Sequence, residues 1–313
     1  MTLALLAGLF LGWSLGANDA ANVIGPAVTS RMIRFRTAAI LAAILVLGGA
    51  IAQGHEGIDT IGGLTEFAPR DAAISSLAAA ITVTLMTLLG LPVSTSQAVV
   101  GAILGVGLVN GQVYTTGLGK VLACWLGTPF GGLLISIILY RALASLYNQI
   151  KISPFQYDRL MRILLIGAGL YGSYALGANN VANVTAVYVG AGQLDVLSAL
   201  LIGGASIGLG ILTFSRRVMD TVGLNLLRLD AFSSLAVLLA EALTVHIYSF
   251  VGVPVSTSQA IIGAVMGVGI VKGVSMVRGR TLAGILAGWF LTPVAASLIA
   301  IGLEFVSHLR YVA

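Results

Sequence analysis

Charged side chains are scarce in this sequence. They make up 9% of its 313 residues, whereas hydrophobic residues make up 58%, a ratio that excludes a soluble domain built around a single core. Apolar runs near the roughly 20 residues needed to cross a bilayer recur from end to end, at 2–28, 37–54, 72–90, 93–109, 121–140, 160–189, 196–214, 231–251, 255–271 and 281–303. The composition therefore predicts an all-α, polytopic protein embedded in the lipid bilayer of the cell (plasma) membrane.

Cysteine is almost absent, since Cys124 is the only one. A single thiol excludes a disulfide framework and a thiolate metal site within one chain. Basic residues are missing ahead of the first apolar run, which continues directly into the polar stretch GANDAAN. A cleaved signal peptide has a charged start and a short apolar core, so we expect this run to be a retained membrane segment.

Three motifs occur twice, in the same order and at offsets of 161, 162 and 164 residues. They are LGANDAANV (15–23) with LGANNVANV (176–184), PVSTSQA (92–98) with PVSTSQA (254–260), and CWLGTPF (124–130) with GWFLTPV (288–294). Three anchors at nearly constant spacing indicate a duplication. The sequence therefore predicts two repeats, 1–150 and 151–313.

The basic residues indicate how these repeats are oriented, because Lys and Arg beside membrane segments mark the cytoplasmic side. With the N-terminus outside and an odd number of crossings in each half, thirteen of the sixteen are cytoplasmic: Arg31, Arg34, Arg36, Arg141, Lys151, Arg159, Arg162, Arg216, Arg217, Arg228, Lys272, Arg278 and Arg280. The halves then have opposite orientations, and both termini are outside. This topology also explains the net charge of +5, so no nucleic-acid partner is predicted. Inverted repeats are typical of secondary transporters, whose substrates bind near the midplane on interrupted helices.

The PVSTSQ motifs are expected to interrupt helices. Pro92 after Leu91, and Pro254 after Val253, disfavour helical geometry and remove a backbone donor. The hydroxyls that follow would cap a new helix, whose start carries free N–H groups and a positive partial charge suited to an anion. Two full crossings, or a hairpin with its tip inside the membrane, are both compatible with the sequence. The residues concerned are Ser94, Thr95, Ser96 and Gln97, with Ser256, Thr257, Ser258 and Gln259.

The GAND-type motifs offer oxygen ligands at membrane depth. Gly16 and Gly177 are expected to loosen the helix there, and polar oxygens that are costly to leave unpaired in hydrocarbon would suit a hard cation. These oxygens belong to Asn18, Asp19, Asn22, Asn179, Asn180 and Asn183. An ionisable residue inside a membrane segment is a functional candidate, which singles out Asp19 and also Glu241, whose repeat counterpart is Ala79. Glu304 is expected to reach the outer surface, and His246 to be a packing residue.

Lysine and arginine are absent from the interior of the apolar runs. A multivalent anion brought to that depth would therefore meet no fixed positive side chain. Its charge would have to be balanced by helix starts, hydroxyl groups and cations bound with it. This absence predicts coupling of anion transport to a cation.

The duplicated GAND and PVSTSQA motifs resemble those of the inorganic phosphate transporter (PiT) family, and the resemblance extends over essentially the whole chain. It implies a phosphate symporter with two hairpin-bearing inverted repeats, forming a homodimer. It assigns phosphate to Ser94, Thr95, Ser96, Gln97, Ser256, Thr257, Ser258 and Gln259, Na⁺ to Asp19, Asn22, Asn180 and Asn183, and coupling to the Glu241 carboxylate. Asn180 stands where the first motif has Asp19, so the two cation sites need not be equivalent.

Several alternatives stay open from the sequence. Sulfate is an alternative substrate for a transporter of the same fold. Protons are an alternative to Na⁺ as the coupling ion, although amide and hydroxyl oxygens favour a metal ion. An intramembrane hydrolase with Ser94 or Ser256 as its nucleophile is disfavoured, since His55 and His308 lie at segment ends and no G-x-S-x-G elbow surrounds these serines. Neither an enzymatic activity nor a cofactor is predicted. An ion channel is the third alternative, disfavoured because channels repeat a pore loop around a symmetry axis.

Overall fold

The structure is a computed structural model that describes residues 2–89, 93–113, 115–219, 229–274 and 279–312. Every regular element in these ranges is helical. The first half contains α1 (Thr2–Val23), α2 (Gly25–Thr29), α3 (Phe35–Gln53), α4 (Glu56–Gly62), α5 (Pro69–Leu88), α6 (Thr95–Asn110) and α7 (Thr115–Asn148). The second half contains α8 (Pro154–Gly190), α9 (Val196–Thr213), α10 (Ser215–Val218), α12 (Ala231–Val251), α13 (Thr257–Lys272) and α14 (Gly279–Val312).

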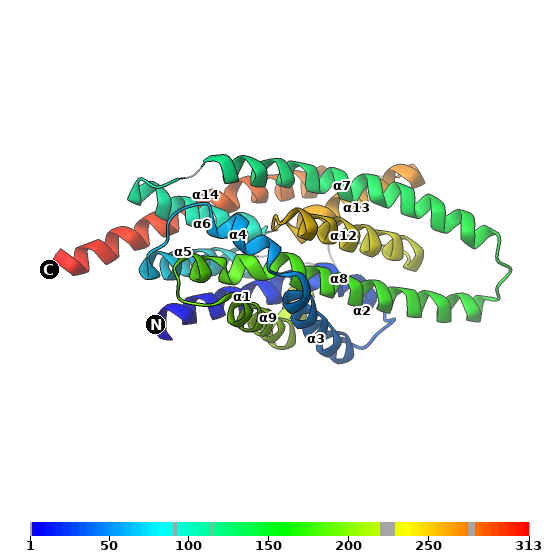
Figure 1. Ribbon diagram of the computed structural model, residues 1–313. Helices are drawn as coiled ribbons and strands as arrows, with labels where there is room; N and C mark the ends of the chain where they lie inside the picture. The colour runs from blue at the N-terminus through cyan, green and yellow to red at the C-terminus, as the bar shows by residue number, and fades with distance from the viewer. Residues whose placement is uncertain (1, 90–92, 114, 220–228, 275–278, 313) are drawn as a thin grey trace.

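The helices form one elongated bundle (Figure 1). Both termini lie toward one end, and the connection between α7 and α8 lies at the other. Within the described ranges, seven helices are long and apolar enough to cross a membrane: α3, α5, α7, α8, α9, α12 and α14. The predicted class of all-helical, multi-pass membrane protein is therefore confirmed. α1 has a comparable length of 22 residues but carries the polar GANDAAN motif in its final third.

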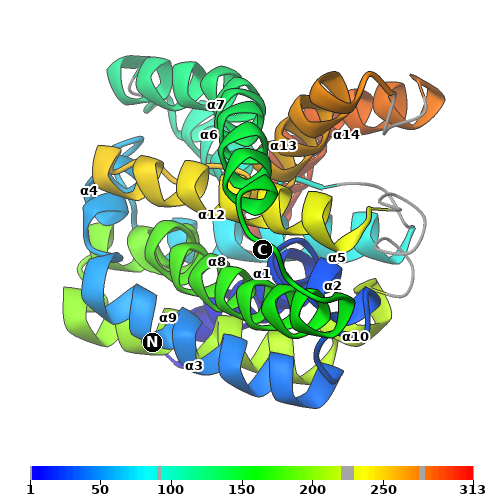
Figure 2. The same cartoon turned by 90° about the vertical axis from the view of Figure 1, so that its right-hand side faces the viewer.

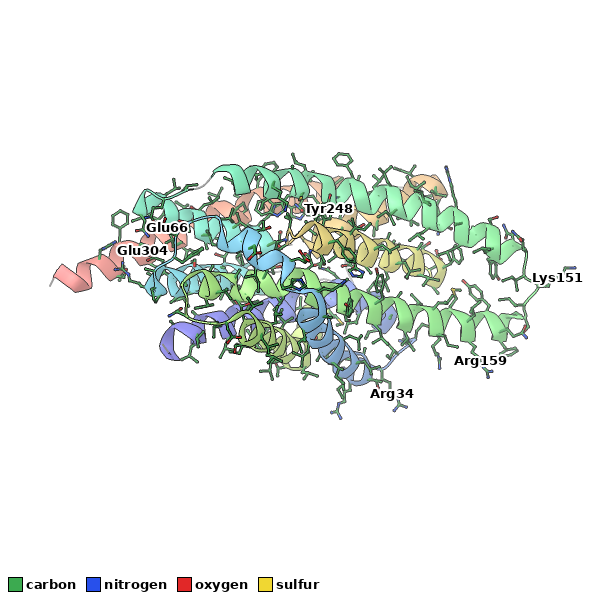
Figure 3. All side chains as sticks on the ribbon, in the orientation of Figure 1. Arg34, Glu66, Lys151, Arg159, Tyr248 and Glu304 are labelled. Atoms are coloured by element: carbon green, nitrogen blue, oxygen red, sulfur yellow. The ribbon has the colours of Figure 1, made fainter. Side chains whose placement is uncertain are left out.

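The repeated motifs lie on helices of matching length. α6 and α13 each contain 16 residues, α7 and α14 each contain 34, and both pairs start at the motif offsets, 162 and 164 residues apart. The starts of α3 and α9, and those of α5 and α12, are separated by nearly the same offset as the repeated motifs. Figure 3 shows Arg34, Lys151 and Arg159 toward the α7–α8 end, and Glu66 and Glu304 toward the opposite end. The inverted orientation of the halves stays a prediction.

The two PVSTSQ motifs follow helix ends, as predicted. α12 ends at Val251, and α13 begins at Thr257 after a non-helical stretch that contains Pro254. In the first copy, α5 ends at Leu88 and α6 begins at Thr95, while Leu91 and Pro92 lie outside the described residues. A 16-residue helix is about 24 Å long, shorter than the roughly 30 Å hydrocarbon layer. α6 and α13 are thus too short to cross, which favours hairpins over full crossings.

Glycine lets the helices approach closely. A β-carbon at Gly101 of α6 would collide with the Pro293 carbonyl of α14, and one at Gly263 of α13 would collide with the Pro129 carbonyl of α7. Each short helix therefore packs on the long helix of the other half. The Gly101/Gly105 and Gly263/Gly267 pairs serve this packing, as small residues do in membrane bundles.

The expectation that Gly16 and Gly177 loosen their helices is wrong. α1 and α8 continue through both positions without a break. A side chain at Gly16 would collide with the Ile207 carbonyl of α9, and one at Gly177 with the Val46 carbonyl of α3. These glycines are needed for close packing, which brings the polar motifs into the centre of the bundle.

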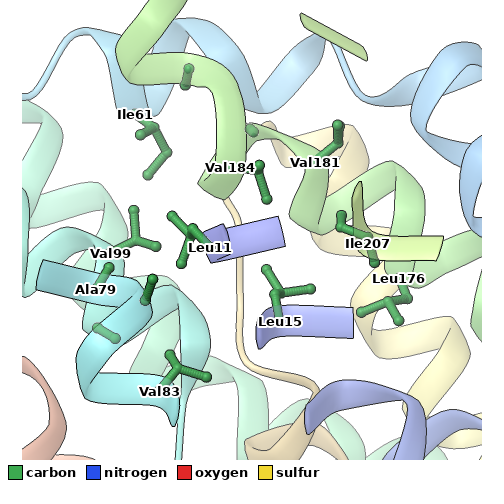
Figure 4. Packing of buried hydrophobic residues seen from close by; sticks show 14 of the residues in the cluster. Leu11, Leu15, Ile61, Ala79, Val83, Val99, Leu176, Val181, Val184 and Ile207 are labelled. Carbon is green, nitrogen blue, oxygen red and sulfur yellow. The ribbon is translucent and has the colours of Figure 1, made fainter. Parts of the chain in front are cut away.

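α1 occupies the middle of the main hydrophobic core. Leu11 and Leu15 are 1% and 0% exposed, and Figure 4 shows them among side chains from α5, α6, α8 and α9. The neighbouring positions are Ala79, Val83, Val99, Val181, Val184 and Ile207. This surrounding shell keeps lipid away from the carboxyl end of α1, where Asp19 lies.

An ion pair between the partly exposed Arg70 and the buried Glu304 joins the start of α5 to the end of α14. Glu304 was expected to extend to the surface, but it is 1% exposed and its Oε2 lies 2.6 Å from Arg70 Nη2. Ser307 also accepts a hydrogen bond from the same guanidinium nitrogen. Glu304 is buried and not at the surface because the Arg70 guanidinium replaces the water that would otherwise solvate its carboxylate.

We expect Arg70→Met to lower the free energy of unfolding by about 3 kcal/mol, because it leaves the Glu304 carboxylate buried without its main partner. Thermal unfolding in detergent would measure this loss. The double variant Arg70→Met with Glu304→Leu should recover most of it, since it removes both charges. Equal stability of Arg70→Met and the unmodified protein would contradict the assignment of a structural ion pair.

A second polar link closes the base of the α12/α13 hairpin. Lys272 donates to Asp230 Oδ2 at 2.6 Å, and the equivalent place in the first hairpin holds Asn110 donating to Asp71 at 3.0 Å. Partial burial alone would raise the pKa of Asp230, but hydrogen bonds from Lys272 and Ser233 outweigh it and lower this pKa to about 2. The lowered pKa of Asp230 means that its interaction with Lys272 stabilises the folded protein when the Asp230 carboxyl group is ionised.

Lys272→Met should therefore lower the unfolding temperature by about 1–3 °C at neutral pH. The stabilisation by Asp230 is present above its unfolded pKa near 4 and is lost as pH falls through about 2. The difference between variant and parent should thus shrink as pH falls from about 4 to about 2. Lys151→Met, in the α7–α8 connection, is the control for charge loss. An equal, pH-independent shift in both variants would exclude the link.

Candidate functional site

The two PVSTSQ tips meet each other in the centre of the bundle. Ser94 and Ser256 cap α6 and α13 as predicted, because their Oγ atoms accept from the backbone N–H of Gln97 at 3.4 Å and of Gln259 at 3.3 Å. Ser96 donates to the Val255 carbonyl at 3.0 Å. These contacts join two segments that are about 160 residues apart in the sequence, and they place both helix starts in one site.

The first tip also contacts both GAND-type motifs. Thr95 donates to Asp19 Oδ2 of α1 at 2.9 Å. Ser96 receives a hydrogen bond from Asn183 of α8 at 2.9 Å and lies 3.3 Å from Asn180 Oδ1. The start of α6 is therefore held between α1 and α8, one helix from each half.

The second tip is bound in a related way. Thr257 accepts a hydrogen bond from Asn22 of α1 at 3.1 Å and also interacts with Asp19. Ser258 donates to the Val93 carbonyl of the first tip at 3.1 Å and shares a 2.8 Å hydrogen bond with Ser256. Asp19 thus lies beside the hydroxyl groups of both tips.

Two asparagines of the GAND-type motifs have structural partners. Asn179 uses both ends of its amide on the second tip, donating to the Val253 carbonyl at 3.1 Å and accepting from the Val255 N–H at 2.8 Å. Asn18 donates to Asp19 at 2.8 Å and accepts from Thr87 at 3.1 Å. The Asn179 contacts position the second tip, and the sequence pattern does not predict them because they involve backbone atoms beside Pro254.

Other polar atoms of the site are buried without a partner among the described residues. Asn183 Oδ1 has no donor, and Asn180 Nδ2 has no acceptor, although both residues are at most 1% exposed. The side-chain oxygens of Gln97 and Gln259 are in the same situation. A free oxygen suits a cation and a free N–H suits an anion, so the site has unused capacity for both.

Glu241, on α12, is a second buried carboxylate. It is 1% exposed, and neither carboxylate oxygen has a hydrogen-bond partner among the described residues. Its Oε2 faces α8 at Gly172, where a β-carbon would be 3.5 Å away, and its charge interacts with that of Asp19. The structure therefore brings Asp19, Asn22, Asn180 and Asn183 to the tips. Glu241 makes no hydrogen bond with them in the described ranges.

Basic side chains take no part in the hydrogen bonds that join the tips to the GAND-type motifs in the described ranges. Lys120, on α7, donates to the Val251 carbonyl at 2.8 Å, which places it at the carboxyl end of α12 and not at the capped start of α13.

His246 forms a hydrogen bond at each ring nitrogen. One joins it to the Tyr171 hydroxyl at 2.7 Å, and the other joins it to the Gln53 side-chain oxygen at 2.6 Å. Its predicted packing role is confirmed.

Comparison with known proteins agrees with this architecture. Residues 15–300 match the model of the phosphate transporter family. A protein of Methanocaldococcus jannaschii with the provisional name phosphate permease MJ0630 is 29% identical, over 96% of this chain and 95% of that protein. The sulfate permease CysP of Bacillus subtilis is 31% identical, over 93% of this chain and 83% of that protein.

A solved structure shares the fold across the full length. It is described as "The sodium-dependent phosphate transporter", has a TM-score of 0.86 and 25% identity, and is matched over 99% of this chain and 100% of that one. The family model covers both tips and both GAND-type motifs. The seven apolar helices and this match over nearly all of the sequence lead to one conclusion: the chain is a multi-pass membrane protein that belongs to the phosphate transporter family.

Proposed function

We propose that the protein is a secondary active transporter that imports inorganic phosphate together with Na⁺. The observation that carries the proposal is a buried site made of two helix starts, their hydroxyl groups and the Asp19 carboxylate. Among the described residues, no basic side chain belongs to its hydrogen-bond network. Helix starts favour an anion. A carboxylate in the same site would repel that anion unless a cation lies between them, so the site favours binding the two ions together.

In this proposal, phosphate binds at both tips. The residues are Ser94, Thr95, Ser96, Gln97, Ser256, Thr257, Ser258 and Gln259. Their capped helices direct positive partial charge toward the point where the tips meet. The free Asn180 Nδ2 adds a donor for a phosphate oxygen. A protonated phosphate also carries a hydroxyl donor, which a glutamine oxygen can accept.

Na⁺ binds to oxygens of the GAND-type motifs in the same proposal, namely those of Asp19, Asn22, Asn180 and Asn183. Asn183 Oδ1 is free for this purpose. Asp19 supplies the negative charge in the first motif, and Asn180 replaces it in the second, so the stronger cation site is expected beside Asp19. Glu241 is buried, and neither of its carboxylate oxygens accepts a hydrogen bond from the described residues, so it is assigned to coupling and not to phosphate contact.

We also propose that the two halves are inverted repeats, with both termini outside, and that the chain forms a homodimer. The equal lengths of α6 and α13, and of α7 and α14, support the repeat. The concentration of arginine and lysine at the α7–α8 end supports a cytoplasmic position for that end. Cysteine accessibility at positions 34 and 66 in intact cells would test the orientation, and light scattering in detergent would test the dimer.

Proteoliposome uptake tests the transport proposal. An imposed Na⁺ gradient at clamped pH should drive accumulation of labelled phosphate, and a pH gradient without Na⁺ should not. Saturable accumulation of phosphate against its own concentration gradient would support an active transporter. The reverse result, with a proton gradient driving uptake in the absence of Na⁺, would replace Na⁺ by H⁺ as the coupling ion.

Sulfate is the second candidate substrate, because the sulfate permease CysP shares 31% identity. Phosphate can donate a hydrogen bond, whereas sulfate at neutral pH only accepts, so the free oxygens of Gln97 and Gln259 favour phosphate. Excess unlabelled sulfate should therefore leave labelled phosphate uptake nearly unchanged. Competition by sulfate at equal concentration would favour sulfate as the substrate.

A further inference from the structure

An apolar groove lies between α7 and α14, on the outer side of the two tips. Figure 2 shows these long helices diverging at one edge of the bundle. The groove has a volume of about 550 Å³, within the range of about 300–1,000 Å³ that is usual for small-molecule sites. Its lining contains no charged side chain in the part of the chain that the structure describes. Its rim includes Leu126, Phe130 and Phe290, which are 72%, 66% and 79% exposed and lie on membrane-spanning helices, so the groove opens toward lipid.

Four polar side chains from both halves line this otherwise apolar space. They form two repeat-related pairs, Gln97 with Gln259 and Trp125 with Trp289. All four are between 3% and 8% exposed. The two glutamine Oε1 atoms and the two indole Nε1 atoms have no hydrogen-bond partner among the described residues. The groove is therefore lined by residues with two acceptor oxygens and two N–H donors that have no partner among the described residues. In apolar surroundings such an unmet hydrogen bond is costly.

The chemistry of these atoms defines what would bind there. An indole N–H needs an acceptor, and an amide oxygen needs a donor. The absence of charged lining residues disfavours an ion, and the lipid-facing rim favours a molecule that reaches the groove through the bilayer. We propose that the groove binds a neutral, lipid-soluble molecule whose hydroxyl or amide group hydrogen-bonds with the glutamine and tryptophan side chains.

Such a molecule would influence the tips through Gln97 and Gln259. Each glutamine belongs to the first turn of a capped helix, with its backbone N–H bonded to Ser94 or Ser256. An occupant that contacts both side chains would hold the two tips at a fixed spacing. This consequence rests on the proposed function, which assigns the same two glutamine oxygens to phosphate. The occupant would therefore compete with phosphate for them, and inhibition of phosphate uptake is the expected result.

Tryptophan fluorescence tests binding without relying on transport. The chain has three tryptophans, and Trp13 lies outside the groove, donating to Thr213 at 2.8 Å. Trp13→Phe therefore leaves only the two groove indoles. Tribromoethanol and bromoform both quench indole, but only the first carries a hydroxyl. With both concentrations expressed as concentrations in the membrane, tribromoethanol should reach half-quenching of Trp13→Phe at about one-fifth of the bromoform concentration, as one net hydrogen bond predicts.

Two further variants separate the groove from the general lipid surface. Trp125→Phe with Trp289→Phe leaves only Trp13, which should be quenched equally by the two compounds. Gln97→Leu with Gln259→Leu, in the Trp13→Phe background, should remove the preference for the alcohol. Equal quenching of Trp13→Phe by both compounds, or the same preference at Trp13, would overturn the proposal even if the glutamine variant does not fold. Binding without any effect on uptake would retain the site and reject its influence on the tips.

Discussion

Asp19→Asn is expected to abolish Na⁺-driven phosphate accumulation while leaving the protein folded. Asp19 contacts Thr95 and Asn18 and interacts with Thr257, so its single charge lies beside both tips. Asparagine has the same shape and keeps one acceptor oxygen, and the Thr95 hydroxyl can accept a hydrogen bond where it now donates. The variant therefore removes the charge that attracts the cation without removing the packing.

The expected loss in coupled uptake is on the order of tenfold to a hundredfold, the usual size of a coupling between two binding sites. Both net uptake and phosphate exchange should fall, because phosphate then enters the site without a neutralising cation. Uptake by proteoliposomes, together with an unchanged elution volume and unfolding temperature, measures the two parts of the prediction. Asp71→Asn, at the base of the first hairpin, is the matched control. Full uptake by Asp19→Asn would refute the assigned cation site.

Glu241→Gln is expected to separate coupling from phosphate binding. The carboxylate is 1% exposed and accepts no hydrogen bond from the described residues, so the substitution deprives no neighbour of a partner. The tips and Asp19 stay intact. We therefore expect net Na⁺-driven uptake to fall by on the order of tenfold or more, while exchange of internal for external phosphate continues.

The comparison of net uptake with exchange distinguishes this result from that for Asp19→Asn, in which both should be lost. Labelled phosphate measured with and without unlabelled phosphate inside the vesicles provides the two rates. Asp158→Asn, near the exposed start of α8, is the control for loss of a carboxylate. If Glu241→Gln lowers exchange as strongly as net uptake, Glu241 acts in phosphate binding and the coupling assignment is wrong.

Local features of the site were accessible from the sequence because they depend on neighbouring residues. The Ser94 and Ser256 caps involve a hydroxyl and an N–H three residues later, so the motif alone predicts them. The break at Pro254 is equally local, because proline removes a donor at its own position. The duplication is visible as a repeated pattern and needs no coordinates.

Glycine and carboxylate roles were harder to predict because their partners are far away in the sequence. Gly16 looked like a helix-loosening residue, but its role is set by the Ile207 carbonyl on another helix. Glu304 looked like a surface carboxylate, but Arg70, 234 residues away, keeps it buried. Composition and spacing contain no information on which distant group fills the space beside a side chain.

The sequence by itself determined the membrane class, the duplicated motifs, the capped helix starts and the lack of basic residues in the apolar runs. Only the tertiary structure decided that the two tips share one site, and that Thr95 pairs with Asp19 of its own half while Ser96 pairs with Asn183 of the other. It also decided that Glu241 is buried without a hydrogen-bond partner among the described residues. The physical reason is that a duplicated sequence offers each tip two equivalent motifs. Close packing of helices at glycine, which acts between residues far apart in the chain, decides which residues of these motifs each tip contacts.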